Sequence, residues 1–308
     1  MKKIFMGILI FILGIFTFAK GYPSKNINLI VPFAAGGGTD AVARKLGSLL
    51  EKELGQPVII VNKTGGAGAV GMTYGATSKK DGYNITMITR EIVSLPLMKL
   101  SPITYQNFDL VSLINMDPAV VLVGKDSKYN SFEEIIQDAK SNPEKIKFAS
   151  TAKPNFYALA IENELGIKFN HIPYNGAGEV VPALLGNHAD FTLMGPGEAI
   201  GQIKSGQFRA LGLMATERVA TLPEVPTLKE LGYNIVSGTW RGIAVPKGTN
   251  KEIVATLNNA IEKITQSQDF NEFMNNANYG VKYLGPKEFK VFIEEDTAAI
   301  KEMLTNLK

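Results

Sequence analysis

Hydrophobic residues along the chain alternate between short β-branched runs and stretches with helical spacing. The runs Ile27–Val31, Val58–Val61 and Ile85–Ile88 are typical of buried strands. Between the first two runs, apolar residues recur at helical spacing from Asp40 to Leu54, and Gly55 is a residue type that commonly ends helices. This half of the chain therefore predicts strands separated by helices.

The same alternation continues toward the C-terminus. Ser131 and Glu134 resemble a capping box, Thr249 and Glu252 open a further predicted helix, and an amphipathic helix is expected from Pro286 to the end. The predicted strands are Ile146–Ala149, Ile167–Ile172, Phe191–Met194 and Leu211–Met214. Alternating strands and helices predict an α/β fold of mostly parallel sheets with helices on both faces.

Two strand-like stretches are candidates for connections between domains, Ala119–Val123 and Thr239–Val245. If each crosses between lobes, the middle of the chain is a second domain inserted in the first. We therefore expect a discontinuous lobe 1 of residues 21–118 plus 241–308, and a lobe 2 of residues 119–240.

The N-terminus has the pattern of a signal peptide. Lys2 and Lys3 precede an uncharged run from Ile4 to Phe16, which is shorter than the roughly 20 apolar residues of a membrane-spanning helix and suits a signal core of about 7–15 residues. Thr17 and Ala19 are small residues before a cleavage site, so residues 1–20 are expected to be removed. The alternative is an uncleaved N-terminal anchor.

The composition narrows the possible functions further. The chain has no cysteine, which excludes disulfides, thiol catalysis, thiolate metal sites and attachment of a lipid anchor at the cleavage site. Three of its 32 basic residues lie among the first 20 residues, and the remainder balances the 29 acidic residues. The predicted mature protein is therefore about neutral, without the clustered cations of a nucleic-acid-binding protein, and we expect it unanchored in the periplasm.

A glycine-rich loop follows the first predicted strand, in the segment Val31–Asp40. Glycines allow backbone amides to approach a ligand, and the helix that follows adds partial positive charge, so the loop suits a carboxylate or a phosphate. Gly36, Gly38 and Ala41 also match a dinucleotide fingerprint, but the ribose-binding acid expected after the second strand is replaced by Asn62. A tight turn without a ligand is the remaining alternative.

Further loops rich in small residues follow other predicted strands. They are the segments 64–71, 150–152, 174–179 and 195–197. Because ligands of α/β sheets bind at the carboxyl ends of the strands, such loops predict a cleft lined by backbone donors from both lobes.

Catalytic constellations are scarce. His171 and His188 lie in no metal-binding or nucleophile motif, and both are interpreted as structural or surface residues. Asp40, Glu179 and Glu198 are either an acidic cluster or helix N-terminal carboxylates, of which the second is favoured. Arg90 follows the third strand, where it pairs either with a ligand carboxylate or with a neighbouring residue. We expect no enzymatic activity, no cofactor and no metal.

In order and spacing, the motifs of the chain resemble the Bug family, the extracytoplasmic solute receptors of tripartite tricarboxylate transporters. The resemblance rests on Tyr22–Lys25, Val31–Asp40, Leu54–Pro57, Gly65–Gly71, Asp81–Tyr83, Pro173–Tyr174, Arg209–Leu211 and Leu222–Thr227. It implies a two-lobed, type II-like periplasmic-binding-protein fold, the Venus flytrap, which holds a small carboxylate between its lobes and delivers it to membrane permease subunits.

The resemblance also implies the ligand-binding residues. They are Phe33, Gly37, Gly38, Thr39, Asp40, Gly66, Ala67, Gly68, Ser150, Thr151, Tyr174 and Gly195. Arg90 is added to these candidates because of its place after the third strand. We expect Thr39 and Asp40 to lie at an exposed turn, and we expect the protein to be a monomer.

The chain departs from the family pattern where specificity would be set. Arg90 and Glu91 replace small residues, and Lys153 and Pro154 interrupt the loop that follows Ala149. The two added cations favour a ligand with more than one carboxylate, such as a di- or tricarboxylate. The alternatives are an accessory protein that reports a bound ligand to a membrane kinase, and a periplasmic enzyme acting on a small acid.

Overall fold

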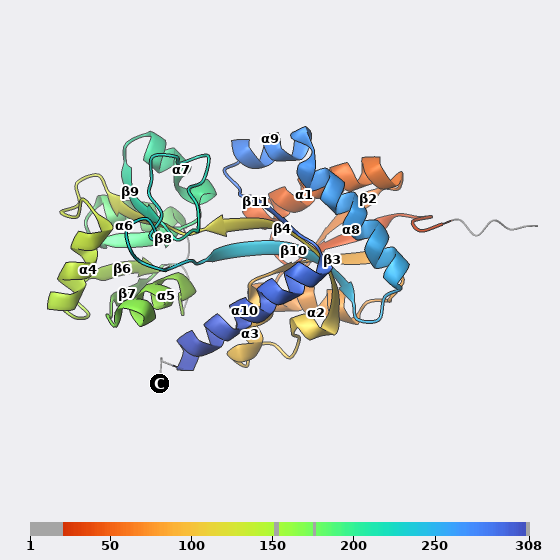
Figure 1. Cartoon of the computed structure of the whole chain (residues 1–308), viewed down its shortest axis with the longest axis horizontal. Coiled ribbons are helices and arrows are strands. Elements are labelled where there is room, and N and C mark those ends of the chain that lie inside the picture. Colours follow the sequence, from red (N-terminus) through yellow and green to blue (C-terminus); the bar gives the residue numbers. More distant parts are fainter. Residues whose placement is uncertain (1–20, 151–153, 175–176, 306–308) are drawn as a thin grey trace, which may run out of the picture.

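The chain folds into two lobes side by side along the long axis of the molecule (Figure 1). The computed structural model describes residues 21–150, 154–174 and 177–305. The predicted signal peptide, residues 1–20, and the predicted site residue Thr151 lie outside the described residues.

Lobe 1 is built on a six-stranded sheet with the order β11-β4-β10-β3-β1-β2. Its strands are β1 (Ile27–Val31), β2 (Val58–Asn62), β3 (Asn84–Thr89), β4 (Phe108–Pro118), β10 (Gly238–Pro246) and β11 (Val281–Leu284). Leu29 and Ile30 are both buried. Because consecutive side chains of a strand point to opposite faces, helices must cover both faces of this sheet.

Lobe 2 is built on a five-stranded sheet with the order β7-β6-β8-β5-β9. Its strands are β5 (Val120–Gly124), β6 (Lys147–Ser150), β7 (Asn170–Pro173), β8 (Phe191–Met194) and β9 (Phe208–Leu213). The order repeats that of β2-β1-β3-β10-β4 in lobe 1, so the two lobes share one topology.

Both sheets are mixed, which corrects the expectation of mostly parallel sheets. β1 pairs parallel with β2 and β3, and β6 pairs parallel with β7 and β8. β10 and β5, however, each run antiparallel to both of their neighbours. These two strands begin directly after the chain has crossed from the other lobe, and they therefore enter the sheet against the direction set by its βα units.

The chain crosses between the lobes at two adjacent points. It leaves lobe 1 between β4 and β5 and returns before β10, and there the Ala119 amide donates to the Ser237 carbonyl at 3.0 Å. The Ser237 amide donates in turn to Met214 at 3.0 Å. Gly238 already belongs to the six-stranded sheet, a few residues before the expected lobe limit at 240, and the lobe limits given above stay a proposal.

The helices pack in pairs on the faces of the two sheets. They are α1 (Gly38–Leu54), α2 (Ala69–Thr77), α3 (Glu91–Leu97), α4 (Phe132–Ser141), α5 (Phe156–Leu165), α6 (Ala177–Leu185), α7 (Pro196–Lys204), α8 (Lys251–Gln266), α9 (Gln268–Asn276) and α10 (Pro286–Thr305), with short 3-10 turns η1 (Gly66–Gly68) and η2 (Tyr105–Asn107). α8 begins one residue after Asn250, whose side chain accepts from the Glu252 amide, so Asn250 and not Thr249 caps this helix.

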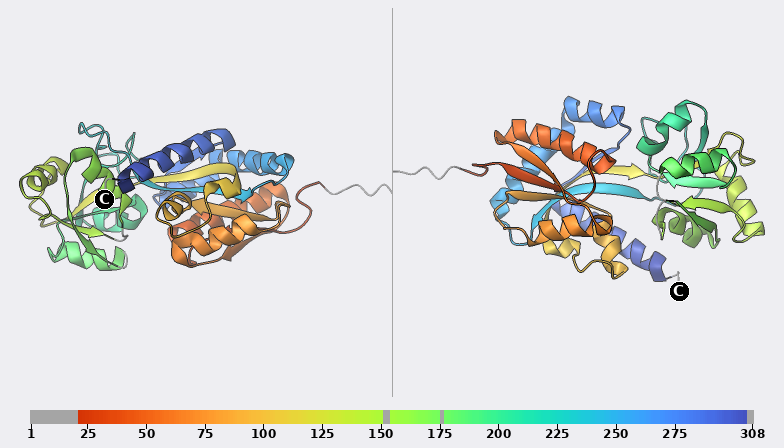
Figure 2. Two further views of the ribbon diagram at one scale, coloured as in Figure 1. Left: turned by 90° about the horizontal axis from the view of Figure 1, so that it is seen from below. Right: turned by 180° about the vertical axis from the view of Figure 1, so that it is seen from behind.

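The C-terminal helix α10 bridges the two lobes. It extends from lobe 1 toward α5 of lobe 2 in the views of Figures 1 and 2. Ile293 and Ile300 of α10 are buried in one hydrophobic cluster with Trp240, and Phe156 of lobe 2 packs against this cluster. Met303 of α10 packs against the core of lobe 2. Within the described residues, no helix combines the length and apolar character needed to span a membrane.

Candidate functional site

A cavity of about 420 Å³ lies between the lobes. This volume is in the range of small-molecule sites, roughly 300–1,000 Å³. Lobe 1 lines it with Phe33, Gly37, Gly38, Thr39, Arg90, Glu91, Ser94, Asp117, Thr239, Arg241 and Tyr279. Lobe 2 lines it with Pro154, Asn155, Phe156, Tyr157, Leu193, Gly195, Gly197 and Glu198.

The first glycine loop presents the start of α1 to this cavity. Gly37 is the N-cap of α1 and offers no side-chain cap. The amides of Gly38 and Thr39 have no acceptor among the described residues. Free amides in the first turn, together with the partial positive charge of a helix of this length, form a binding position for an anion.

Arg241 of β10 lies beside this helix start and is 7% exposed. Its Nε donates to Thr39 Oγ1 at 3.1 Å, and its Nη1 donates to Asp117 Oδ2 at 2.6 Å and to Asn115. No acceptor for Nη2 exists among the described residues, and this atom lies 3.3 Å from where a Cβ of Gly38 would stand. The guanidinium therefore has a donor left for a ligand next to the free amides of α1.

Asp40 is buried, 2% exposed, which contradicts the expectation of an exposed turn. Its carboxylate accepts from the Gly36 amide at 2.9 Å, from Arg44 at 2.8 Å and from Asn62 at 2.9 Å. Burial raises the pKa of Asp40, but these donors outweigh burial and hold the pKa below its ordinary value. Asp40 thus stabilises the glycine loop through these hydrogen bonds. It is not one of the residues that line the cavity.

Arg90 lines the cavity, but its donors are occupied by the protein. Its Nη2 lies 2.7 Å from Asp296 Oδ1 and its Nε 3.1 Å from the same oxygen. Its Nη1 donates to Ser237 Oγ at 3.0 Å and to the Gly238 carbonyl at 3.1 Å. The Trp240 indole donates to Asp296 at 2.9 Å. Of the two alternatives for Arg90, the structure favours pairing within the protein, with Asp296 rather than with Glu91.

Tyr157, in the first turn of α5, faces the cavity from lobe 2. Burial raises the pKa of its phenol, while Arg90 and Arg241 lower it and Glu91 and Glu198 raise it. Four charged groups of the cleft therefore act on this side chain. Its hydroxyl has no hydrogen-bond partner in the described part of the chain, so it is a protonated donor available to a ligand.

The other predicted residues divide into those at the cavity and those behind it. Phe33, Gly37, Gly38, Thr39, Arg90 and Gly195 line the cavity. The turn Gly66–Gly68 does not line it but supports it, because a Cβ on Gly68 would meet the Phe33 ring at 3.2 Å. Ser150 is buried, and Tyr174 packs against the core of lobe 2 and donates its amide to the Ser150 carbonyl at 2.8 Å.

The prediction missed the residues that carry most of the side-chain chemistry of the cleft, namely Arg241, Tyr157, Tyr279 and Asp117. Asp117, Arg241 and Tyr279 lie far in the sequence from the glycine loops. Arg241 belongs to the stretch Thr239–Val245, which the sequence predicts only as a connection between the lobes. One feature of the sequence could have indicated Asp117 and Arg241. Both are polar residues of strands that meet the connection between the lobes, Asp117 near the end of β4 and Arg241 near the start of β10.

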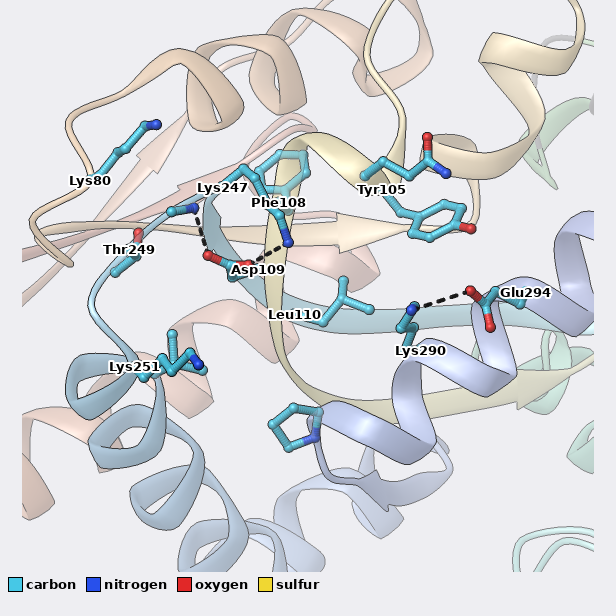
Figure 3. Close-up of a pocket in the computed structure, with 14 residues that line it drawn as sticks. Lys80, Tyr105, Phe108, Asp109, Leu110, Lys247, Thr249, Lys251, Lys290 and Glu294 are labelled. Carbon is cyan, nitrogen blue, oxygen red and sulfur yellow. Dashed lines mark hydrogen bonds and ion pairs between the residues drawn. The ribbon is translucent and has the colours of Figure 1, made fainter.

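A larger cavity, of about 780 Å³, opens on lobe 1 (Figure 3). Lys247 and Lys290 line it but are paired with Asp109 at 2.7 Å and with Glu294 at 3.6 Å. Its lining residues all belong to lobe 1, so closure of the lobes would not enclose a ligand there. We therefore take the smaller interlobe cavity as the candidate site. Across the described ranges, no group of histidine and acidic side chains is arranged to hold a metal.

Known proteins are similar to this chain in sequence and in fold. The profile of the tripartite tricarboxylate transporter family receptors (TctC) matches residues 42–308. Protein BugT of Bordetella pertussis is 32% identical over 277 residues, which cover 84% of this chain and 85% of BugT.

Solved structures are similar over nearly the whole chain. A TctC solute-binding protein from Polaromonas, solved without ligand, is 34% identical with a TM-score of 0.83, covering 92% of this chain and 99% of that one. MatC from Rhodopseudomonas palustris, solved with bound malate, is 25% identical with a TM-score of 0.75, covering 92% and 99%. The two-lobed fold predicted from the sequence is thus confirmed.

Proposed function

Because the chain belongs to the family of tripartite tricarboxylate transporter receptors, we propose that it captures a small organic carboxylate in the periplasm and delivers it to membrane permease subunits. Solute-binding receptors form a non-enzymatic class. Malate bound to MatC supports a carboxylate as the ligand.

One observation carries the proposal. The buried Arg241 turns an unpaired Nη2 toward the place where the first amides of α1 are also without acceptors. Two or three donors that converge on one point, one of them charged, match the two oxygens of a carboxylate. The Tyr157 hydroxyl adds a donor from the opposite lobe.

Lobe closure would complete the capture. A ligand that touches both lobes favours the closed form by its additional contacts, and the exclusion of water strengthens each contact between a donor and an anion. The two crossing segments, near Ala119 and Ser237, are the natural hinge because, within the part of the chain that the structure describes, they alone continue the backbone between the sheets.

The test is isothermal titration with protein that has been unfolded, dialysed and refolded to remove any ligand. The panel holds mono-, di- and tricarboxylates, aromatic acids and amino acids. We expect at least one of them to bind with a Kd of ~1 μM or below, about −8 kcal/mol. If no carboxylate binds at millimolar concentration, although circular dichroism shows a refolded protein, the proposal is wrong.

A further inference from the structure

The charges that line the cleft can be assigned one by one. Among the described residues, they are carried by Arg90, Glu91, Asp117, Glu198 and Arg241. Arg90 is paired with Asp296 at 2.7 Å, and Arg241 is paired with Asp117 at 2.6 Å. Both arginines are at least nine-tenths buried, so each ion pair is held by the protein and leaves no net charge in the cleft.

Of the charged residues that line the cleft, Glu91 and Glu198 belong to neither of these ion pairs. Glu91, at the first position of α3 in lobe 1, accepts a hydrogen bond from the Thr89 hydroxyl. Glu198, in the first turn of α7 in lobe 2, accepts from the Gly195 amide at 3.2 Å. Neither carboxylate has a cationic partner among the described residues. The cleft thus keeps two acidic groups, one on each lobe.

The two carboxylates face one cleft from opposite lobes. Both line the same cavity, and both act electrostatically on Tyr157, as does Arg241. Glu198 also acts on Tyr279, beside Arg241 and Gly38. A ligand whose carboxylate meets Arg241 and the start of α1 therefore has its remaining atoms within the field of Glu91 and Glu198.

We infer that the ligand is an amino-carboxylate, whose cationic amino group lies between Glu91 and Glu198 while its carboxylate is held by Arg241 and α1. This inference rests on the proposed function. It differs from the sequence-based interpretation that Arg90 and Lys153 favour a ligand with more than one carboxylate: Arg90 is paired within the protein, and Lys153 lies outside the described residues. A second carboxylate in this position would face two acidic groups, whereas an ammonium group forms charge-assisted hydrogen bonds to both.

Titration calorimetry with three series of equal chain length tests the inference on refolded, ligand-free protein. The series are ω-amino acids such as 4-aminobutyrate, dicarboxylates such as succinate, and monocarboxylates without a second charged group such as butyrate. α-Amino acids are measured as well. We expect the best amino-carboxylate to bind at least ~10-fold more tightly than the dicarboxylate of the same length, the size of effect that one charge-assisted hydrogen bond gives.

Charge-removing variants assign the effect to the two carboxylates. Glu91→Gln and Glu198→Gln should each weaken amino-carboxylate binding about tenfold and should not weaken monocarboxylate binding, because a negative charge is removed from the cleft. Glu133→Gln, on the exposed face of α4 away from the cleft, is the matched control and should change neither.

The outcomes separate the inference from the proposed function. Preferential binding of dicarboxylates, or an unchanged preference in both variants, overturns the amino-carboxylate inference while the proposed function stands. Absence of binding for all three series overturns the amino-carboxylate inference, and the proposed function itself falls only if the tricarboxylates and aromatic acids of the wider panel also fail to bind. Thermal unfolding of each variant shows whether it is folded, and because the two glutamates lie on different lobes, one folded variant is sufficient.

Discussion

Arg90 and Asp296 form a buried ion pair that joins the start of α3 to the middle of α10, with 2.7 Å between Nη2 and Oδ1. The same guanidinium holds Ser237 and the Gly238 carbonyl, at the point where the chain returns from lobe 2 to lobe 1. Arg90 therefore fixes α10 and the returning crossover to each other, and it is a positioning residue of the hinge.

Arg90→Met should lower the free energy of unfolding by about 3 kcal/mol, because it leaves the Asp296 carboxylate buried without a cation. Urea denaturation measures the change. Adding Asp296→Leu should restore much of the loss, since the unpaired charge is then removed as well. Lys290→Met breaks an exposed pair on the same helix and should change little. Equal effects of Lys290→Met and Arg90→Met would contradict this role.

Tyr157→Phe should weaken ligand binding about fivefold to tenfold, the value of one hydrogen bond of about 1 kcal/mol. Stability should stay unchanged, because the hydroxyl has no partner among the described residues. Calorimetric titration and thermal unfolding measure the two quantities. Tyr129→Phe is the opposite case, because its hydroxyl donates to Asp138 at 2.6 Å. That variant should lose stability and keep its affinity, and a loss of affinity in both variants would argue against a direct contact by Tyr157.

Gly197→Ala should hinder lobe closure and weaken ligand binding. A Cβ at Gly197, in lobe 2, would lie 3.1 Å from the Ala277 carbonyl oxygen and 3.1 Å from a ring carbon of Tyr279, both in lobe 1. Small-angle scattering with saturating ligand should show a larger radius of gyration than for the unaltered protein. Gly201→Ala, one turn later on α7, meets nothing within 4 Å, so it should close normally.

Asp40→Asn should lower the melting temperature more at pH 7 than at pH 3. The pKa of Asp40 is lowered in the folded protein, so its stabilisation is present above the ordinary value of 3.8 and is lost as the pH falls through the folded-state value. The gap between variant and unaltered protein should shrink with acidification. Asp126→Asn, at an exposed loop, is the control. A gap that is equal at both pH values would show that the carboxylate charge is not what braces the loop.

The sequence alone determined the elements and the class of protein. Strands such as Ile27–Val31 and helices such as α1 are fixed by local periodicity, which is set by the geometry of the backbone. The glycine loop at Gly36–Gly38 was predictable for the same reason, because the anion-binding position at the start of α1 needs only consecutive residues. The order of such motifs also sufficed to predict the two-lobed fold.

Only the tertiary structure decided which charges a ligand can meet. Arg90 reads as a free cation in the sequence, yet its partner Asp296 is supplied by the last helix. Arg241 reads as an ordinary strand residue, yet Asp117 and Thr39 aim it at the start of α1. The net charge of the cleft depends on pairings between residues up to 206 positions apart, and no local pattern encodes such pairings because they form only when the two crossover strands and α10 pack together.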